Sequence, residues 1–112
     1  MYDNNNIFAK ILRGEISCEK TYEDENVLFI KDINPKAKIH ILGIPKVSCI
    51  DFHDFVENHD EKIVYDFFIK TKKVINLLGL NKGGYRIITN SGVNGCQEVP
   101  HFHIHILGGE KL

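Results

Sequence analysis

Residues 100–107 alternate histidine with apolar side chains and carry His101, His103 and His105 within five positions. Successive side chains of a β-strand point to opposite faces of its sheet. The period of two therefore predicts a strand with all three imidazoles on one face and the apolar side chains in the core. Any fold of this chain has to bury one face of that strand while the other presents histidine.

From spacing alone, this row of histidines is compatible with three roles. Neutral imidazoles are good ligands for zinc or copper, so the row suits a metal site. It also suits a solvated strand face without a function. The third role is nucleophilic or acid–base catalysis, because a neutral imidazole near pH 7 is both a nucleophile and a hydrogen-bond partner. We favour catalysis, since the strand holds no cysteine or acidic residue and Cys96 lies across a proline.

The rest of the pattern predicts an α+β fold with a five-stranded antiparallel sheet, one short helix and one long helix, and with the helices on one face of the sheet. Apolar residues at helical spacing indicate the short helix over residues 6–13 and the long amphipathic helix over 60–78. Apolar runs between turn residues predict the strands, at residues 22–24, 27–31, 39–44, 85–90 and 101–107.

Length and charge limit the class of protein. The chain has 112 residues without a repeat or linker, so we expect a single domain over 1–112. A formal net charge of −1 lacks the Lys and Arg excess of proteins that bind nucleic acid or an acidic membrane surface. No apolar run approaches the roughly 20 residues that span a bilayer, and the first residues lack a secretory signal. Cys18, Cys49 and Cys96 fit neither a disulfide framework nor a zinc knuckle. We expect a cytoplasmic protein.

The histidine segment resembles the HisΦHisΦHisΦΦ signature of the histidine triad family, in which Φ is hydrophobic. The likeness extends over nearly the whole chain in family order. Residues 7–11 resemble the first helix of the family, 22–35 its first hairpin, 39–46 its central strand and 90–100 its substrate loop. The ending at Gly108 and Gly109 is most similar to the purine nucleoside phosphoramidase branch.

This resemblance implies a hydrolase or transferase that cleaves at the α-phosphorus of adenosine or other purine nucleoside 5′-phosphoramidates, or of related adenylates, and needs no cofactor. By motif position, His103 is the nucleophile, and water resolves the AMP–histidine intermediate that it forms. His105 would hold a phosphate oxygen. His101 and His40 would complete a hydrogen-bonded cluster that orients His103 and assists proton movement to the leaving group.

The resemblance also implies substrate-binding residues. Asp32 would accept hydrogen bonds from the ribose hydroxyls, because two neighbouring donors suit one carboxylate. An apolar slot around the base would be formed by Phe8, Ile11 and Ile33. The phosphate, ribose and leaving group would meet Asn90, Cys96, Gln97, Glu98 and Val99.

Several of these residues also fit plainer roles. By pattern alone, Asp32 is equally a turn former, and Asn90 is a strand end. Phe8 and Ile11 suit the core of an amphipathic helix, and His40 suits a buried core histidine. We expect His53 and His59, which lie in a polar stretch, at the surface.

The sequence departs from the family pattern in two respects. Glu98 stands where the phosphoramidase branch often carries serine. Its carboxylate would repel an anionic leaving group and so favours a cationic amine. Bacterial members that bind structural zinc carry cysteines where this chain has Asn6 and Ala9, and a histidine ligand where it has Ser48. We therefore predict no metal.

The resemblance further implies a homodimer in which the two sheets join through the long helices and adjacent strands. The helix face with Phe67, Phe68 and Ile75 would then be partly interface. Alternative functions are a dinucleoside polyphosphate hydrolase, a nucleotide-binding scaffold with little turnover, and a metal-storage or sensor module.

Overall fold

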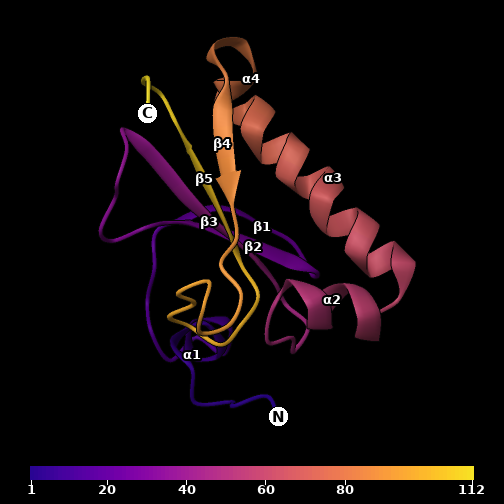
Figure 1. Cartoon of the computed structure of the whole chain (residues 1–112). Helices are drawn as coiled ribbons and strands as arrows, with labels where there is room; N and C mark the ends of the chain where they lie inside the picture. The colour runs from indigo at the N-terminus through magenta and orange to yellow at the C-terminus, as the bar shows by residue number, and fades with distance from the viewer.

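The computed structural model describes residues 1–112 and contains a five-stranded antiparallel sheet with the strand order β1-β2-β3-β5-β4 (Figure 1). The strands are β1 (Lys20–Glu23), β2 (Val27–Lys31), β3 (Ile39–Pro45), β4 (Tyr85–Ile88) and β5 (Ile104–Gly108). The predicted α+β class and the five-stranded antiparallel sheet are thus confirmed.

Four helices accompany the sheet: α1 (Ile7–Leu12), α2 (Phe52–Asn58), α3 (Glu61–Leu77) and α4 (Leu80–Gly83). The short and long helices correspond to α1 and α3, whereas α2 and α4 were not predicted. Asp51 caps α2 by accepting a hydrogen bond from the amide of Asp54, and Phe55 is the helix's single buried residue. Phe52, Phe55 and Val56 have helical spacing, but the helix has only seven residues, which is too short for an apolar period to identify it. None of the helices combines the length and apolar character needed to cross a bilayer.

An aromatic core lies between the sheet and helices α2 and α3. Phe67 of α3 contacts the rings of Phe29, Phe55 and Phe102 with centroid distances of 6.0, 5.5 and 5.6 Å. Phe67 is 0% exposed and Ile75 is 4% exposed, so both belong to this core. The prediction that they contribute to an interface is wrong for these two residues. Residues on the outward side of α3 remain exposed, including Phe68 at 38%.

The opposite face of the sheet is covered near its middle by α1, so the helices do not share one face as the sequence predicted. Phe8 of α1 packs there in a second apolar cluster with Leu28, Ile30, Leu42 and Ile44. Because side chains alternate along β3, His40 lies on the same face as Leu42. The α1 side of the sheet therefore combines an apolar cluster with a histidine, whereas the α3 side holds the aromatic core.

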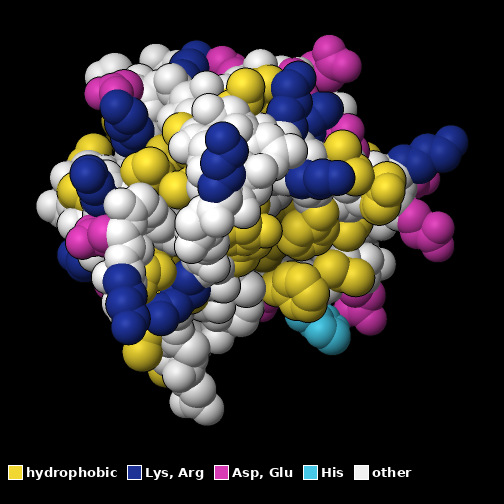
Figure 2. Space-filling model, turned by 90° about the horizontal axis from the view of Figure 1, so that it is seen from above, with side chains coloured by type: hydrophobic (Ala, Val, Ile, Leu, Met, Phe, Trp, Pro, Cys, Tyr) yellow, Lys and Arg dark blue, Asp and Glu magenta, His cyan; other side chains and the backbone are white.

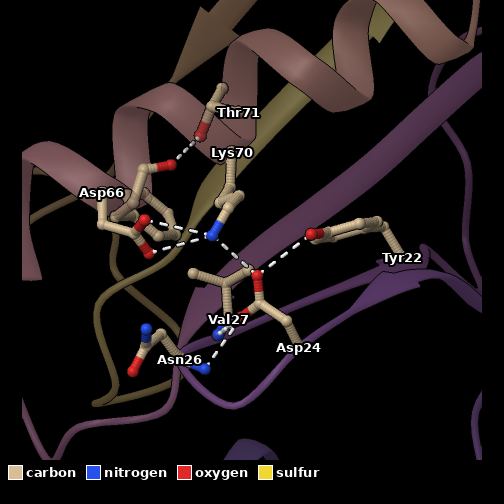
Figure 3. A network of polar contacts seen from close by, with 8 residues as sticks. Tyr22, Asp24, Asn26, Val27, Asp66, Lys70 and Thr71 are labelled. Atoms are coloured by element: carbon tan, nitrogen blue, oxygen red, sulfur yellow. Dashed lines mark hydrogen bonds and ion pairs between the residues drawn. The ribbon is translucent and has the colours of Figure 1, made fainter.

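A polar network connects the β1–β2 hairpin to α3 (Figure 3). The ammonium of Lys70 lies 2.8 Å from Asp24 Oδ2 and 3.0 Å from Asp66 Oδ1, and the hydroxyl of Tyr22 donates to Asp24. Burial acts to raise the pKa of Asp24, but hydrogen bonds from Lys70, two backbone amides and Tyr22 outweigh it and lower the pKa to about 2. The hairpin is thereby attached to the helix by a carboxylate that is charged at neutral pH.

Candidate functional site

A cleft of about 660 Å³ opens on the α1 side of the sheet. It is bordered by α1, the β2–β3 connection, the central strands and the loop that precedes β5. Eleven of the thirteen predicted site residues line it: Phe8, Ile11, Asp32, Ile33, His40, Asn90, Cys96, Glu98, Val99, His103 and His105. Gln97 and His101 do not.

His103 is 6% exposed and has one ring nitrogen committed to the backbone. Its Nδ1 lies 2.7 Å from the carbonyl oxygen of His101. A carbonyl can only accept, so Nδ1 must carry the hydrogen, and Nε2 keeps its lone pair. Burial lowers the pKa of His103, although the hydrogen bond to the His101 carbonyl works in the other direction. His103 is therefore a neutral imidazole at pH 7 with an unprotonated nitrogen.

His40 and His105 form a directed hydrogen-bonded pair. The backbone amide of Lys36 donates to His40 Nδ1 at 3.0 Å, so the ring hydrogen of His40 sits on Nε2. That atom lies 2.9 Å from His105 Nδ1 and 3.3 Å from Asp32 Oδ2. His105 Nδ1 then accepts, and its hydrogen is on Nε2. The chain of donors starts at a backbone amide and ends with a free N–H on His105.

Charge on this pair is disfavoured at neutral pH. Burial lowers the pKa of His105 to about 4, and the neighbouring His103 and His40 add to that effect. Burial also lowers the pKa of His40, although the carboxylate of Asp32 opposes it. The cleft thus presents a nucleophilic nitrogen on His103 beside a neutral hydrogen-bond donor on His105, whose ring lies 5.2 Å away between centroids.

Asp32 combines the two roles considered for it. Its Oδ1 accepts a hydrogen bond from the backbone amide of Asn34 at 2.8 Å, as in a turn former. Its side chain also borders the cleft, with Oδ2 directed towards His40. The carboxylate is therefore held in place by the turn while it faces the site.

Asp32, His40 and His105 each offer one ligand atom, and these atoms all lie within 4.8 Å of one another. Such a grouping can hold a metal ion. Two of the three ligand atoms already share the hydrogen bond between His40 and His105. Absence of metal stays a prediction, to be tested by metal analysis of protein purified without a histidine tag.

His101 lies behind the cleft, which differs from the predicted row of three accessible imidazoles. It is 0% exposed; its Nε2 lies 2.8 Å from the carbonyl oxygen of Pro45, and its Nδ1 lies 2.5 Å from the hydroxyl of Tyr2. The predicted strand over 101–107 begins only at Ile104. Pro100 has no amide hydrogen, the amide of His101 donates to the carbonyl of Val99 at 2.8 Å, and that of Phe102 donates to the carbonyl of Cys49 at 2.9 Å, so these residues do not pair with a neighbouring strand.

The loop before β5 is held together by side chains predicted to touch substrate. The amide of Gln97 donates to the carbonyls of Ile50 and Val99, which places it outside the cleft lining. The amide of Asn90 borders the cleft but donates to the carbonyl of Gly95 at 2.8 Å. Both residues shape the loop that carries Glu98.

Three groups that matter for the histidines were not predicted: the hydroxyl of Tyr2, the amide of Lys36 and the carbonyl of Pro45. The last two are backbone atoms, which carry no sequence signal. Tyr2 stands alone ahead of the first helix, so no spacing or motif marks it. His53 lies at the surface as predicted, whereas His59 is half-buried and bonded to the carbonyl of Ser48.

The lowered pKa values predict a pH dependence. We expect the imidazole of His105 to titrate near pH 4 and that of His103 below 6.5 in an NMR titration. In the unfolded chain these histidines bind protons near pH 6.5, whereas the folded protein binds them only at lower pH. The free energy of unfolding should therefore fall as the pH drops from about 6.5 towards 4. Titration of both rings at the ordinary value would contradict this description of the site.

Comparison with known proteins gives matches along the whole chain. The HIT domain model matches residues 13–112. An uncharacterized HIT-like protein of Rickettsia prowazekii is 45% identical over 112 residues, which cover 100% of this chain and 93% of the relative. The structure of a HIT family hydrolase from Legionella pneumophila superposes with a TM-score of 0.89 at 39% identity, covering 96% of this chain and 95% of the other. A histidine triad nucleotide-binding protein from Candida albicans gives 0.81 at 30% identity, covering 91% and 73%.

Proposed function

The chain belongs to the HIT, or histidine triad, family, and from that premise we propose that it hydrolyses purine nucleoside 5′-phosphoramidates or related adenylates at the α-phosphorus. The observation that carries the proposal is the pair of fixed tautomers in the cleft. His103 offers a lone pair on Nε2, and His105 offers a hydrogen on its own Nε2. A nucleophile next to a donor for a phosphate oxygen is what displacement at phosphorus requires.

The reaction proceeds in two displacements. His103 Nε2 attacks the α-phosphorus, a phosphorus–nitrogen bond to histidine forms, and the bond to the leaving amine breaks as the amine takes up a proton from solvent in the cleft. His105 Nε2–H holds a non-bridging oxygen, and the bonded His40 supports it. Water then attacks the phosphorus and gives up a proton to solvent, the phosphorus–nitrogen bond breaks with its electron pair returning to His103 Nε2, and AMP is released. The covalent intermediate replaces one difficult displacement by two easier ones.

We expect the nucleoside base to lie against the apolar residues of the cleft. Phe8, Ile11 and Ile33 are among its lining residues, and Ile33 is 87% exposed, so its side chain is free to contact a ligand. Asp32 also lines the cleft, with its Oδ2 3.3 Å from His40 Nε2. A carboxylate in that position suits the two neighbouring hydroxyls of a ribose.

The proposal is tested by measuring, with chromatography, the AMP that is released from adenosine 5′-phosphoramidate. We expect steady turnover, with a lower kcat/KM for diadenosine polyphosphate assayed under the same conditions. Faster cleavage of the polyphosphate would favour the alternative hydrolase. Tight AMP binding without turnover of either compound would favour a nucleotide-binding scaffold and overturn the proposed activity.

Glu98 is expected to select the leaving group. It is exposed on the loop that lines the cleft, and its charge reaches His103, whose pKa it helps to raise against the larger effect of burial. Changing Glu98→Gln should lower kcat/KM for a phosphoramidate with a cationic amine by about threefold relative to one with an anionic amine, because exposed charges interact weakly. At high salt, which screens the charge of Glu98, the ratio of kcat/KM for the two substrates should become the same in Glu98→Gln and in wild type.

Glu57→Gln is the matched control, since Glu57 is an exposed carboxylate on α2, outside the cleft lining. It should leave the ratio of the two substrates unchanged. A ratio equally insensitive to Glu98→Gln would remove Glu98 from leaving-group selection.

We also propose that the protein is a homodimer. Helix α3 exposes Tyr65, Ile69 and Leu77, the edge strand β4 exposes Ile87, and apolar side chains gather into a broad patch on the face seen in Figure 2. Light scattering should give the mass of two chains, and Ile69→Glu should give that of one, because a buried unpaired carboxylate is costly. Val93→Glu, on an exposed loop, should keep the dimer; a monomeric wild type would refute the proposal.

A further inference from the structure

The N-terminal segment reaches the histidine cluster through one side chain, that of Tyr2. Its hydroxyl lies 2.5 Å from Nδ1 of His101, and the two rings meet edge to face with centroids 5.5 Å apart. With Tyr2 in place, His101 is completely buried. Tyr2 thus packs against His101, which does not line the cleft.

The direction of the hydrogen bond follows from the other side of the ring. His101 Nε2 faces the carbonyl of Pro45 at 2.8 Å and must carry the ring hydrogen. His101 Nδ1 can then only accept, so the hydroxyl of Tyr2 donates. Burial raises the pKa of Tyr2, although Asn6 opposes the shift, and this keeps the hydroxyl protonated.

The segment that carries Tyr2 is held in a turn. Asn6 donates from its side-chain amide to the carbonyl of Asp3 at 2.8 Å and caps α1 by accepting from the amide of Ala9 at 2.9 Å. The side chain of Arg13 adds a hydrogen bond to the carbonyl of Asn4. These hydrogen bonds hold the backbone that follows Tyr2 in place against α1.

The segment that receives this contact lacks the support of the sheet. His101, Phe102 and His103 precede the first residue of β5, so no strand ladder holds them. Individual contacts do so instead: the amide of Phe102 donates to the carbonyl of Cys49, and the ring of His101 is held between Tyr2 and Pro45. The backbone carbonyl of His101 is the acceptor that sets the tautomer of His103.

We propose that Tyr2 is a positioning residue that acts through His101. By holding the ring of His101 against Pro45, it fixes the peptide whose carbonyl binds His103 Nδ1–H, and so keeps His103 Nε2 unprotonated in the cleft. The kinetic consequence rests on the proposed phosphoramidase activity, whereas the effect on the tautomer of His103 does not.

The test is Tyr2→Phe, which removes the hydroxyl and keeps the ring that packs on His101. We expect kcat to fall about tenfold while KM stays within about twofold, because misalignment of a nucleophile affects the chemical step more than binding. Tyr22→Phe is the matched control: it also removes a hydrogen-bonded hydroxyl, 3.0 Å from Asp24 and outside the cleft lining, and should leave kcat within about twofold of wild type.

Imidazole ¹⁵N spectra of the free protein supply a readout that general loss of stability does not mimic. In wild type, His103 should show one tautomer with hydrogen on Nδ1; in Tyr2→Phe, it should show a mixture, whereas Tyr22→Phe should match wild type. An unchanged His103 tautomer together with an unchanged kcat in Tyr2→Phe would overturn the inference. If wild type cleaves none of the substrates, the proposed function fails, and the spectra alone decide the role of Tyr2.

Discussion

Replacing His103 by alanine is expected to lower kcat for a purine nucleoside phosphoramidate by about 10,000-fold or more, because the variant has no atom that can form the covalent intermediate. The other groups of the cleft remain, so AMP should still bind with an affinity close to that of wild type. The ring of His103 packs on that of Phe8 at 4.8 Å between centroids, and its loss leaves a small cavity at the edge of the α1 cluster. The protein should therefore stay folded.

Rapid quenching and mass spectrometry distinguish this loss from general damage. Wild type should carry a transient mass increase of one AMP on the peptide with His103, and the variant should carry none. His53→Ala removes an exposed histidine on α2, with 82% of its side chain accessible, and should change neither kcat nor the labelled peptide. AMP on a different residue, or steady turnover by His103→Ala, would contradict the assignment of the nucleophile.

How far the site could be predicted depends on whether side chains or backbone atoms determine it. The alternation of residues 101–107 was enough to place His103 and His105 on the cleft side of the sheet. The same rule failed for His101, because Pro100 and the amide of His101 interrupt strand pairing before Ile104. The antiparallel pairing followed from hairpin-like spacing, and the helices α1 and α3 from their apolar period. The strand order, with β5 between β3 and β4, was not predicted.

The chemistry of the histidines was not accessible in this way. Most of the groups that set the tautomers are backbone atoms: the amide of Lys36 for His40, the carbonyl of His101 for His103, and the carbonyl of Pro45, together with the hydroxyl of Tyr2, for His101. Backbone atoms are the same at every position, so no pattern of residue types indicates which of them will meet an imidazole. The apolar side chains of α3 illustrate a related difficulty, since periodicity does not separate the buried Phe67 from the exposed Phe68.

The role of His105 leads to the second large effect. Changing His105→Ala removes the N–H that faces the cleft and is expected to lower kcat by about 100-fold to 1,000-fold, as expected for loss of one preoriented donor to the charge that develops on phosphate. The intermediate should still form on His103, but slowly, so the labelled peptide should be the same as in wild type. Single-turnover rates with adenosine 5′-phosphoramidate measure this loss.

His40 provides the sharper test, because it acts on substrate only through His105. His40→Gln keeps an amide N–H that can donate to His105 Nδ1, whereas His40→Ala leaves that nitrogen without its donor at 2.9 Å. If the direction of the chain from Lys36 to His105 is what sets the donor in the cleft, glutamine should retain more of kcat than alanine, and His105→Ala should abolish the difference between them. Equal rates for the two His40 variants would mean that His105 does not need His40 to present its hydrogen. The carboxylate of Asp32, 3.3 Å from the same nitrogen of His40, would then have to be considered as the group that orients the pair.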